Sequence, residues 1–234
     1  MALNNGNTQQ LRPTYYGYID NTWDALVVVE AALGGGLTHI ARRPHDRERE
    51  HLIQSGSVFV YEENASGIKR WTDGLNWSPS RILGNFLIYR ELETPFPPGE
   101  KKKATKKNLK SNSSRNGVSK ASSDGGHQRS ARVAGAIANA VGSQSPPPSE
   151  QERRLVGSLV DSYPFKKGGL LKKTISLNKG SVTHHVICYY SLEDVMHDML
   201  LTPTSDPRLR SCIPRPELFE NQSFRVALDH EGLF

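Results

Sequence analysis

The stretch from Lys69 to Arg81 reads KRWTDGLNWSPSR and combines cations, two tryptophans and turn-forming polar residues, a mixture that does not suit a buried core. Lysine and arginine neutralise phosphates, and the narrow minor groove of DNA attracts arginine. Hydroxyl groups, and backbone N–H groups near a glycine, can fix the register of a protein on phosphates. The tryptophans can anchor the loop to the protein body. We therefore expect a nucleic-acid-binding loop that uses Lys69, Arg70, Trp71, Thr72, Asp73, Gly74, Trp77, Ser78, Ser80 and Arg81.

Two further pairs of basic residues, Arg42–Arg43 and Lys172–Lys173, can extend this surface. The arginines of the mixed run DRERE can do so too, but arginine and glutamate at helical spacing commonly form solvent-exposed pairs. We therefore expect the loop to be supported by the two basic pairs, and we interpret the DRERE run as an exposed helical face.

The charge of the 234-residue chain is unevenly distributed, although its net value is +6. Residues 1–93 carry 9 Lys or Arg against 11 Asp or Glu, residues 94–149 carry 10 against 2, and residues 150–234 carry 11 against 11. The basic character therefore comes from the middle of the chain. A nucleic-acid surface on the flanking blocks must be a local cluster on one face.

Residues 94–150 contain a lysine run and long Ser-, Gly- and Pro-rich stretches, with few large apolar residues. Such a segment cannot bury enough apolar surface to offset its conformational entropy. We expect a disordered linker or insertion. It can serve as a flexible spacer, or Lys101–Lys110 can act as a nuclear-import signal or a phosphate-binding arm.

No apolar run approaches the roughly 20 residues that span a bilayer, and the first residues lack the pattern of a signal peptide. We therefore expect an intracellular protein without membrane contact. Cys188 and Cys212 are too few for a disulfide framework, and we interpret both as reduced packing residues.

An enzyme is the less favoured interpretation. His184, His185 and Cys188 are close in sequence, and His45–Asp46 can be imagined as an acid/base pair. Adjacent residues of a strand point to opposite faces, so the two histidines cannot bind one metal together. No phosphate loop, nucleophile elbow or zinc-protease motif is present. The sequence predicts no catalytic activity, no metal and no cofactor.

Capping residues and hydrophobic periodicity predict a mixed fold. The expected helices lie near residues 22–33, 44–55 and 192–201, and the expected strands near 57–62, 67–71, 86–92, 170–177 and 181–191. Thr22 is the expected N-cap of the first helix, Ser191 begins a capping box with Asp194, and residues 78–80 are expected to form a helical turn. The fold class is α+β, with a mostly antiparallel sheet and a few flanking helices.

Several strings closely resemble the WOPR-box family of fungal transcription regulators. They are GYIDNTWDAL, ARRPHDRERE and SGSVFVYEENASGIKRWTDGLNWSPSRILGNFLIYREL, followed after the linker by LVGSLVDSYPFKKGGLLKKTISL and HHVICYYS. The resemblance covers residues 12–93 and 153–210. It implies one DNA-binding domain made of two intertwined blocks, with a first block at 12–93, a linker at 94–150, a second block at 151–215 and a tail at 216–234.

The resemblance also implies a function. The chain is expected to be a nuclear, sequence-specific regulator of fungal morphology and development that binds an AT-rich double-stranded DNA element partly through the minor groove. DNA-facing positions are expected within Lys69–Arg81, supported by Arg42–Arg43 and Lys172–Lys173. Transcription co-regulators are candidate partners.

Two further hypotheses remain open from the residues. The tryptophans and the Tyr- and Phe-rich strands can instead form a protein-interaction surface. Thr72 follows two basic residues and one spacer, the pattern that basophilic kinases favour, so it is a candidate phosphorylation site. A phosphate there would weaken DNA binding by electrostatic repulsion.

Overall fold

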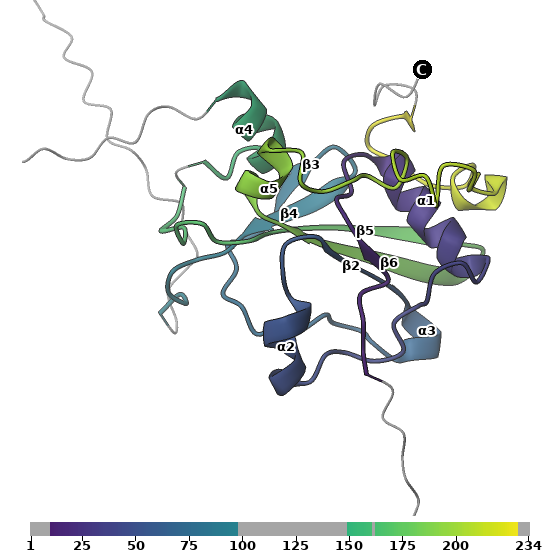
Figure 1. Cartoon of the computed structure of the whole chain (residues 1–234), viewed down its shortest axis with the longest axis horizontal. Coiled ribbons are helices and arrows are strands. Elements are labelled where there is room, and N and C mark those ends of the chain that lie inside the picture. The colour runs from purple at the N-terminus through teal and green to yellow at the C-terminus, as the bar shows by residue number, and fades with distance from the viewer. Residues whose placement is uncertain (1–9, 98–148, 161, 229–234) are drawn as a thin grey trace, which may run out of the picture. The chain divides into compact units, whose positions relative to one another are not determined.

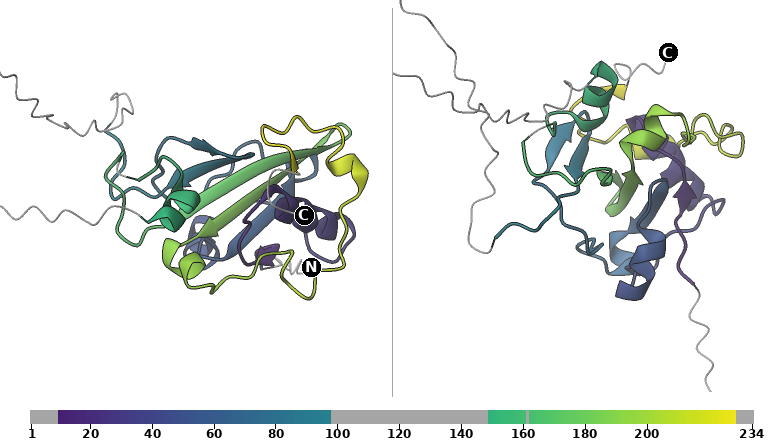
Figure 2. Two further views of the ribbon diagram at one scale, coloured as in Figure 1. Left: turned by 90° about the horizontal axis from the view of Figure 1, so that it is seen from above. Right: turned by 60° about the vertical axis from the view of Figure 1, so that its left-hand side comes forward.

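The computed structural model describes residues 10–97, 149–160 and 162–228 (Figures 1 and 2). A six-stranded antiparallel sheet has the order β1-β2-β6-β5-β4-β3. Its strands are β1 (Tyr15–Tyr16), β2 (Ser57–Glu62), β3 (Arg81–Leu83), β4 (Phe86–Arg90), β5 (Leu171–Lys179) and β6 (Val182–Tyr190). The two long strands β5 and β6 come from the second part of the sequence and lie between β2 and β4 of the first. The expected antiparallel α+β fold and the intertwining of two sequence blocks are confirmed.

The helices lie on both faces of this sheet. They are α1 (Thr22–Leu33), α2 (Asp46–Leu52), α3 (Glu63–Ser66), α4 (Glu150–Val156), α5 (Leu192–Met196) and a 3₁₀ turn at Pro216–Leu218. Helix α1 belongs to the larger apolar core, which contains Val58, Val186 and Tyr190. The opposite face carries a smaller core around Phe59 and Tyr189. Figure 1 accordingly draws α1 and α5 in its upper half and α2 and α3 in its lower half.

Several local predictions are wrong. The N-cap of α1 is Asn21, which accepts a hydrogen bond from Asp24 N at 2.9 Å, so the expected Thr22 lies inside the first turn. Residues 67–71 form no strand, because α3 replaces the expected hairpin turn and Trp71 packs into the smaller core. Residues 78–80 form no helical turn, because Ser78 exchanges hydrogen bonds with the backbone of Arg90.

Three further elements differ from the expectations. Strand β3 pairs with β4 across a turn that begins at Gly84, whose φ of 57° suits glycine. Helix α5 begins after its expected cap Ser191 but ends at Met196, and Asp198 then adopts a φ of 53°. Helix α4, capped by Ser149, was not expected. Almost all of the expected linker, including Lys101–Lys110, lies outside the described residues.

The described helices are all too short or too polar to cross a bilayer.

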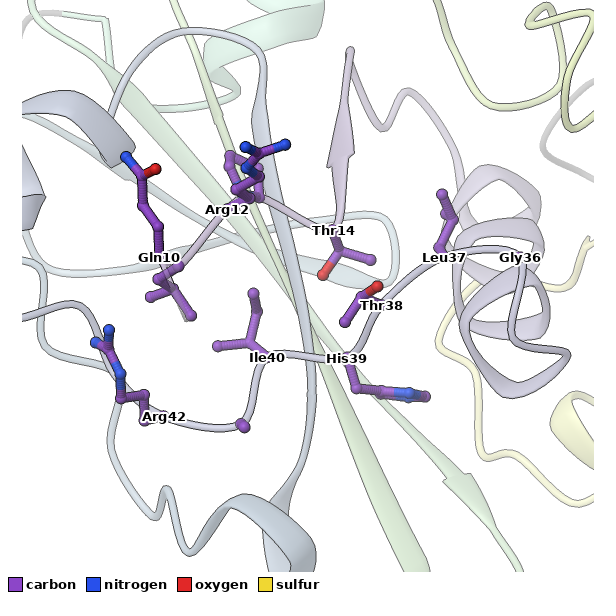
Figure 3. Close-up of a pocket in the computed structure, with 12 residues that line it drawn as sticks. Gln10, Arg12, Thr14, Gly36, Leu37, Thr38, His39, Ile40 and Arg42 are labelled. Atoms are coloured by element: carbon purple, nitrogen blue, oxygen red, sulfur yellow. The ribbon is translucent and has the colours of Figure 1, made fainter. Parts of the chain in front are cut away.

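Two extended segments, 10–14 and 36–42, flank the outer part of β2. Thr14 Oγ1 accepts a hydrogen bond from Val60 N at 2.9 Å, and Ile40 N donates to Val60 O at 2.8 Å. A groove of about 750 Å³ lies between these segments, with Arg12 and Arg42 among its lining residues (Figure 3). The segment 10–14 leads into β1, and the segment 36–42 leads from α1 to the basic residues at 42–49.

His39 of the second segment lies against the buried His184 of β6, with ring centroids 5.4 Å apart. Neither ring nitrogen of His184, nor Nε2 of His39, has a hydrogen-bond partner within the described part of the chain. Burial lowers the pKa of both imidazoles. Folding therefore favours the neutral form of both rings.

This pair predicts a loss of stability in acid. Unfolded histidine titrates near about pH 6.5, so below that pH the unfolded chain binds more protons than the folded chain. The stability contributed by the neutral rings should be fully present above that pH. As the pH decreases below that value, the free energy of unfolding should decrease by up to about 1.4 kcal/mol per pH unit for each histidine. Urea unfolding between about pH 7 and about pH 5 measures this slope. His184→Phe should flatten it, whereas His51→Asn, at an exposed position, should not. Equal slopes in both variants would contradict the assignment.

Candidate nucleic-acid interface

The carboxylate of Asp73 holds the loop 69–81 against the sheet. Asp73 is only 5% exposed. Its Oδ2 accepts hydrogen bonds from Lys172 Nζ at 2.8 Å and from the Tyr189 hydroxyl at 2.7 Å. Its Oδ1 accepts from Trp77 Nε1 at 2.8 Å and from Leu75 N at 3.2 Å. Burial alone would raise the pKa of Asp73, but Lys172 and the other donors outweigh burial and lower the pKa, so the carboxylate is ionised.

Both tryptophans of the loop lie against the protein body. Trp71 Nε1 donates to the Tyr189 hydroxyl at 2.7 Å, and its ring stacks on Tyr61 with the two planes 12° apart. The Trp77 ring lies beneath the Lys172 ammonium, 4.4 Å from nitrogen to ring centroid. The indole N–H groups and the Asp73 carboxylate therefore form one connected network with Tyr189.

Lys69 and Arg70 immediately precede this anchor and are exposed. Among the described residues, neither side chain has a hydrogen bond or an ion pair. Because Trp71 fixes the backbone next to them, their charges extend from a defined position and are available to a ligand.

The segment 42–49 brings further cations beside the loop. Exposed Arg43 donates from Nη1 to Thr72 Oγ1 at 3.3 Å. An open groove of about 700 Å³ lies at this junction. Its lining residues are Arg42, Arg43, Pro44, His45, Asp46, Arg47, Arg49 and Thr72. The structure therefore brings the Arg42–Arg43 pair and the loop together.

Not every arginine in this groove is free. Arg42 makes two hydrogen bonds of 2.7 Å to Glu48, and this pairing lowers the pKa of Glu48 to about 2. Arg49 pairs with Asp46 at 2.9 Å and also lies against Gly74, where an added Cβ would come within 2.9 Å of Arg49 Nη1. Gly74 has a φ of 81°, which favours glycine, and any larger residue would also displace the Arg49 side chain. Within the described structure, the DRERE run therefore has one ion pair at helical spacing, between Arg49 and Asp46, while Glu48 pairs with Arg42 outside the run. Arg43 and Arg47 remain exposed.

The C-terminal end of the loop has structural contacts. Arg81 donates to the Tyr163 hydroxyl at 3.0 Å and to the backbone oxygen of Ser80 at 3.0 Å. Ser78 is buried, and its Oγ accepts from Arg90 N at 3.1 Å. Arg81 therefore links the loop to the part of the chain that follows the linker.

The expectation that Lys172 and Lys173 present charge on an outer surface needs correction, because both side chains are buried. The ammonium of Lys172 is paired with Asp73. The ammonium of Lys173 donates to the backbone oxygen of Asp20 at 2.6 Å and lies 4.3 Å from the centroid of the Phe86 ring. Neighbouring residues of β5 point to opposite faces, so the basic pair supports the two sides of the sheet.

The histidines considered for catalysis have other surroundings. His184 is buried beside His39, whereas His185 contacts Ser176 at 2.8 Å and Glu63 at 3.1 Å on the other face. Cys188 is buried, and burial raises the pKa of its thiol to about 12. No cluster of three or more potential metal ligands occurs among the described residues.

Sequence reasoning missed Tyr189 and Tyr163, which hold the two ends of the loop. Tyr189 lies in the expected strand 181–191, but its role as an anchor of the loop depends on the strand register that places it opposite Lys172. Tyr163 lies in an irregular segment, and no sequence signal identifies it.

Replacing Asp73 with alanine should destabilise the fold strongly. The change leaves the buried Lys172 ammonium without its carboxylate, and breaking a buried ion pair costs about 3–5 kcal/mol. Urea unfolding followed by tryptophan fluorescence measures the loss. Asp46→Ala is the matched control, because the Asp46 side chain is 92% exposed, and its loss should stay below about 1 kcal/mol. Similar losses in the two variants would be inconsistent with the anchoring role of Asp73.

Comparison with known proteins identifies relatives over most of the chain. The family model described as Gti1/Pac2 matches residues 14–191. The global transcription regulator sge1 of Gibberella fujikuroi is 55% identical over 223 residues, which cover 95% of this chain and 65% of the relative. The transcriptional regulator MIT1 of Saccharomyces cerevisiae is 38% identical over 89% of this chain and 33% of its own length. The chain thus spans two-thirds or less of these relatives.

A solved structure shares the fold. It is a complex of the WOPR domain of Wor1 from Candida albicans with a 13-base-pair double-stranded DNA, 32% identical, with a TM-score of 0.55. The match covers 90% of this chain and 96% of the other. The relatives are transcription regulators and not enzymes, as expected for this chain. The chain therefore belongs to the Gti1/Pac2 family, the WOPR family that its sequence resembles.

Proposed function

We propose that this chain is a nuclear, sequence-specific transcription regulator that binds double-stranded DNA through the loop 69–81. The observation that carries the proposal is the pairing of exposed Lys69 and Arg70 with an immobilised Trp71. A rigid loop loses little entropy when it binds, so its cations can select a shape. The relative solved with double-stranded DNA supports the same ligand class.

The proposed target is an AT-rich element, read partly through its minor groove. Such sequences have a narrow minor groove whose negative potential attracts an inserted arginine. Arg70 is the arginine of the loop best placed for insertion, because it is exposed, whereas Arg81 already donates a hydrogen bond to the Tyr163 hydroxyl. Arg43 and Arg47, which line the adjacent groove, are proposed to contact phosphates.

The protein-interaction alternative has less support on this surface. Trp71 stacks on Tyr61, and Trp77 lies against Lys172, so both rings are already engaged within the protein. The exposed side chains beside these rings are the charged Lys69 and Arg70. Steep weakening of binding with ionic strength would agree with phosphate contacts, whereas aromatic docking should depend little on salt.

Arg70→Ala should weaken binding to an AT-rich duplex by about 1–3 kcal/mol and reduce the preference over a GC-rich duplex of equal length. Fluorescence anisotropy of the full chain at about 50 mM and about 200 mM salt measures both quantities. Arg154→Ala is the control, because Arg154 is exposed on α4 and pairs only with Glu150 of the same helix within the described structure. If Arg70→Ala and Arg154→Ala both bind like the unaltered chain, Arg70 is not a reading residue.

Phosphorylation of Thr72 by a basophilic kinase is proposed to switch this surface off. Thr72 is exposed, its hydroxyl oxygen is 3.3 Å from Arg43 Nη1, and it borders the arginine-lined groove. A phosphate would add about −1.5 to −2 charges and pair with Arg43, which removes a cation from the DNA surface.

The expected result is at least about tenfold weaker binding of the phosphorylated chain to the AT-rich duplex. Anisotropy of stoichiometrically phosphorylated protein measures it. Thr72→Val should bind within about threefold of the unmodified chain, because it changes no charge. Undiminished affinity of the phosphorylated chain would rule out the switch.

A further inference from the structure

An apolar surface lies at the edge of the sheet formed by β1 and at the end of α5. We call Tyr16, Met196, Met199 and Leu201 the methionine patch. Tyr16 is 63% exposed, Met199 is 69% exposed and Leu201 is 55% exposed, while Met196 is at the margin of exposure. Four of the seven large hydrophobic side chains that are exposed among the described residues therefore belong to this one region.

Backbone contacts hold the patch together. Tyr18 N donates to Leu201 O at 2.9 Å, and the Tyr15 hydroxyl donates to the same oxygen at 3.3 Å. Leu200 and Tyr16 close over Gly56, where an added Cβ would lie 2.9 Å from Leu200 Cδ2 and 2.7 Å from Tyr16 Cζ. The segment 199–201 therefore lies beside the chain that follows β1, with Met199 and Leu201 on either side of Leu200, whose side chain lies over Gly56 as the Tyr16 ring does.

The end of α5 connects to this segment directly. Met199 N donates to Asp194 O at 2.8 Å, which folds the chain back on the helix that carries Met196. The left-handed conformation of Asp198 makes this turn, and aspartate tolerates it better than most residues do. The patch is thus presented by ordered backbone on two elements.

The segment that carries the patch is acidic, whereas helix α4, which packs against α5, has two glutamates and two arginines whose charges balance. Residues 191–206 contain four acidic residues and no lysine or arginine, whereas the chain has a net charge of +6. Asp206 is neutralised by Arg208 at 2.7 Å. The three carboxylates of Glu193, Asp194 and Asp198 remain beside the methionine patch, and within the described chain none of them is in an ion pair.

The patch is separate from the proposed DNA surface. Leu192, Val195 and Leu200 pack against the core that contains α1, whereas Trp71 and Trp77 pack against the core of the opposite face. Figure 1 shows α5 in the upper half of the view and α2 in the lower half. A partner on the patch would therefore leave the loop 69–81 accessible.

We propose that the methionine patch docks a basic amphipathic helix of a partner protein. Unbranched, polarizable methionine side chains adapt to the apolar face of a helix, and such helices bind apolar grooves through residues spaced by three or four positions. The acidic residues of the α5 region select lysine or arginine on the polar face and disfavour acidic helices. This activity goes beyond DNA binding and does not depend on it.

The experiment uses the full chain and a fluorescein-labelled peptide of about 18 residues, with leucine on one helical face and lysine on the other. A second peptide carries glutamate in place of lysine. We expect saturable binding of the lysine peptide in anisotropy titrations, at least about tenfold tighter than that of the glutamate peptide. Preference for the glutamate peptide, or no binding of either peptide, would overturn the proposal.

Two variants locate the binding. Met199→Ser/Leu201→Ser should weaken binding of the lysine peptide by at least about tenfold, and Glu193→Gln/Asp198→Asn should do so through charge alone. Asparagine also tolerates the left-handed backbone at position 198. Ile82→Ser/Leu87→Ser is the matched control, because it removes an exposed apolar cross-strand pair on β3 and β4. An equal loss in the control would mean that the peptide does not use the patch.

Thermal unfolding of each variant tests whether the fold is kept. We expect it to be kept, because Met199 and Leu201 are exposed. Sedimentation velocity of the chain without peptide tests a different occupant. Dimers that form in the unaltered chain and disappear in Met199→Ser/Leu201→Ser would assign the patch to a second copy and would overturn the partner proposal.

Discussion

The buried ion pair between Asp73 and Lys172 is the interaction on which the rest of the candidate interface depends. Asp73 comes from the loop of the first sequence block, and Lys172 comes from β5 of the second. A carboxylate in the interior is tolerated only when its hydrogen bonds are complete, and here Trp77 and Tyr189 supply the remaining donors. The pair therefore joins the two blocks, closes the smaller core and sets the position from which the loop reaches solvent.

The basic residues near the loop fall into two groups, those with partners inside the protein and those exposed to solvent. Lys172 pairs with Asp73, Lys173 donates to the backbone of Asp20, and Arg81 donates to Tyr163. Lys69 and Arg70 are left on the outside, next to a tryptophan that cannot move freely. A flexible basic segment binds any polyanion, whereas cations on a fixed loop can respond to the width of a groove. We therefore propose that the anchored loop supplies sequence selectivity and that the acidic surface near α5 binds a partner.

Much of this was predictable from the sequence, and the exceptions have physical causes. The alternating strands and the capped helix at 22–33 follow from local patterns that tertiary packing reinforces. The fate of Lys172 was not predictable, because burial of a lysine depends on a carboxylate that lies 99 positions away in sequence. The expected strand at 67–71 is absent because of a long-range contact too: Trp71 is held by its side-chain hydrogen bond to Tyr189 and not by backbone pairing with a strand. Local propensity cannot foresee contacts that depend on the register of distant strands.

A double-mutant cycle in DNA binding tests the central claim most directly. Asp73→Asn keeps the size of the side chain but removes the charge that holds Lys172, and Arg70→Ala removes the proposed reading residue. The affinities of the unaltered chain, both single variants and the double variant for one AT-rich duplex are measured at a temperature at which all four are folded. If Asp73 acts by positioning Arg70, the two losses are non-additive by about 1 kcal/mol or more. Losses that add within about 0.5 kcal/mol would show that the anchor and the proposed reading residue act independently, which would contradict the account.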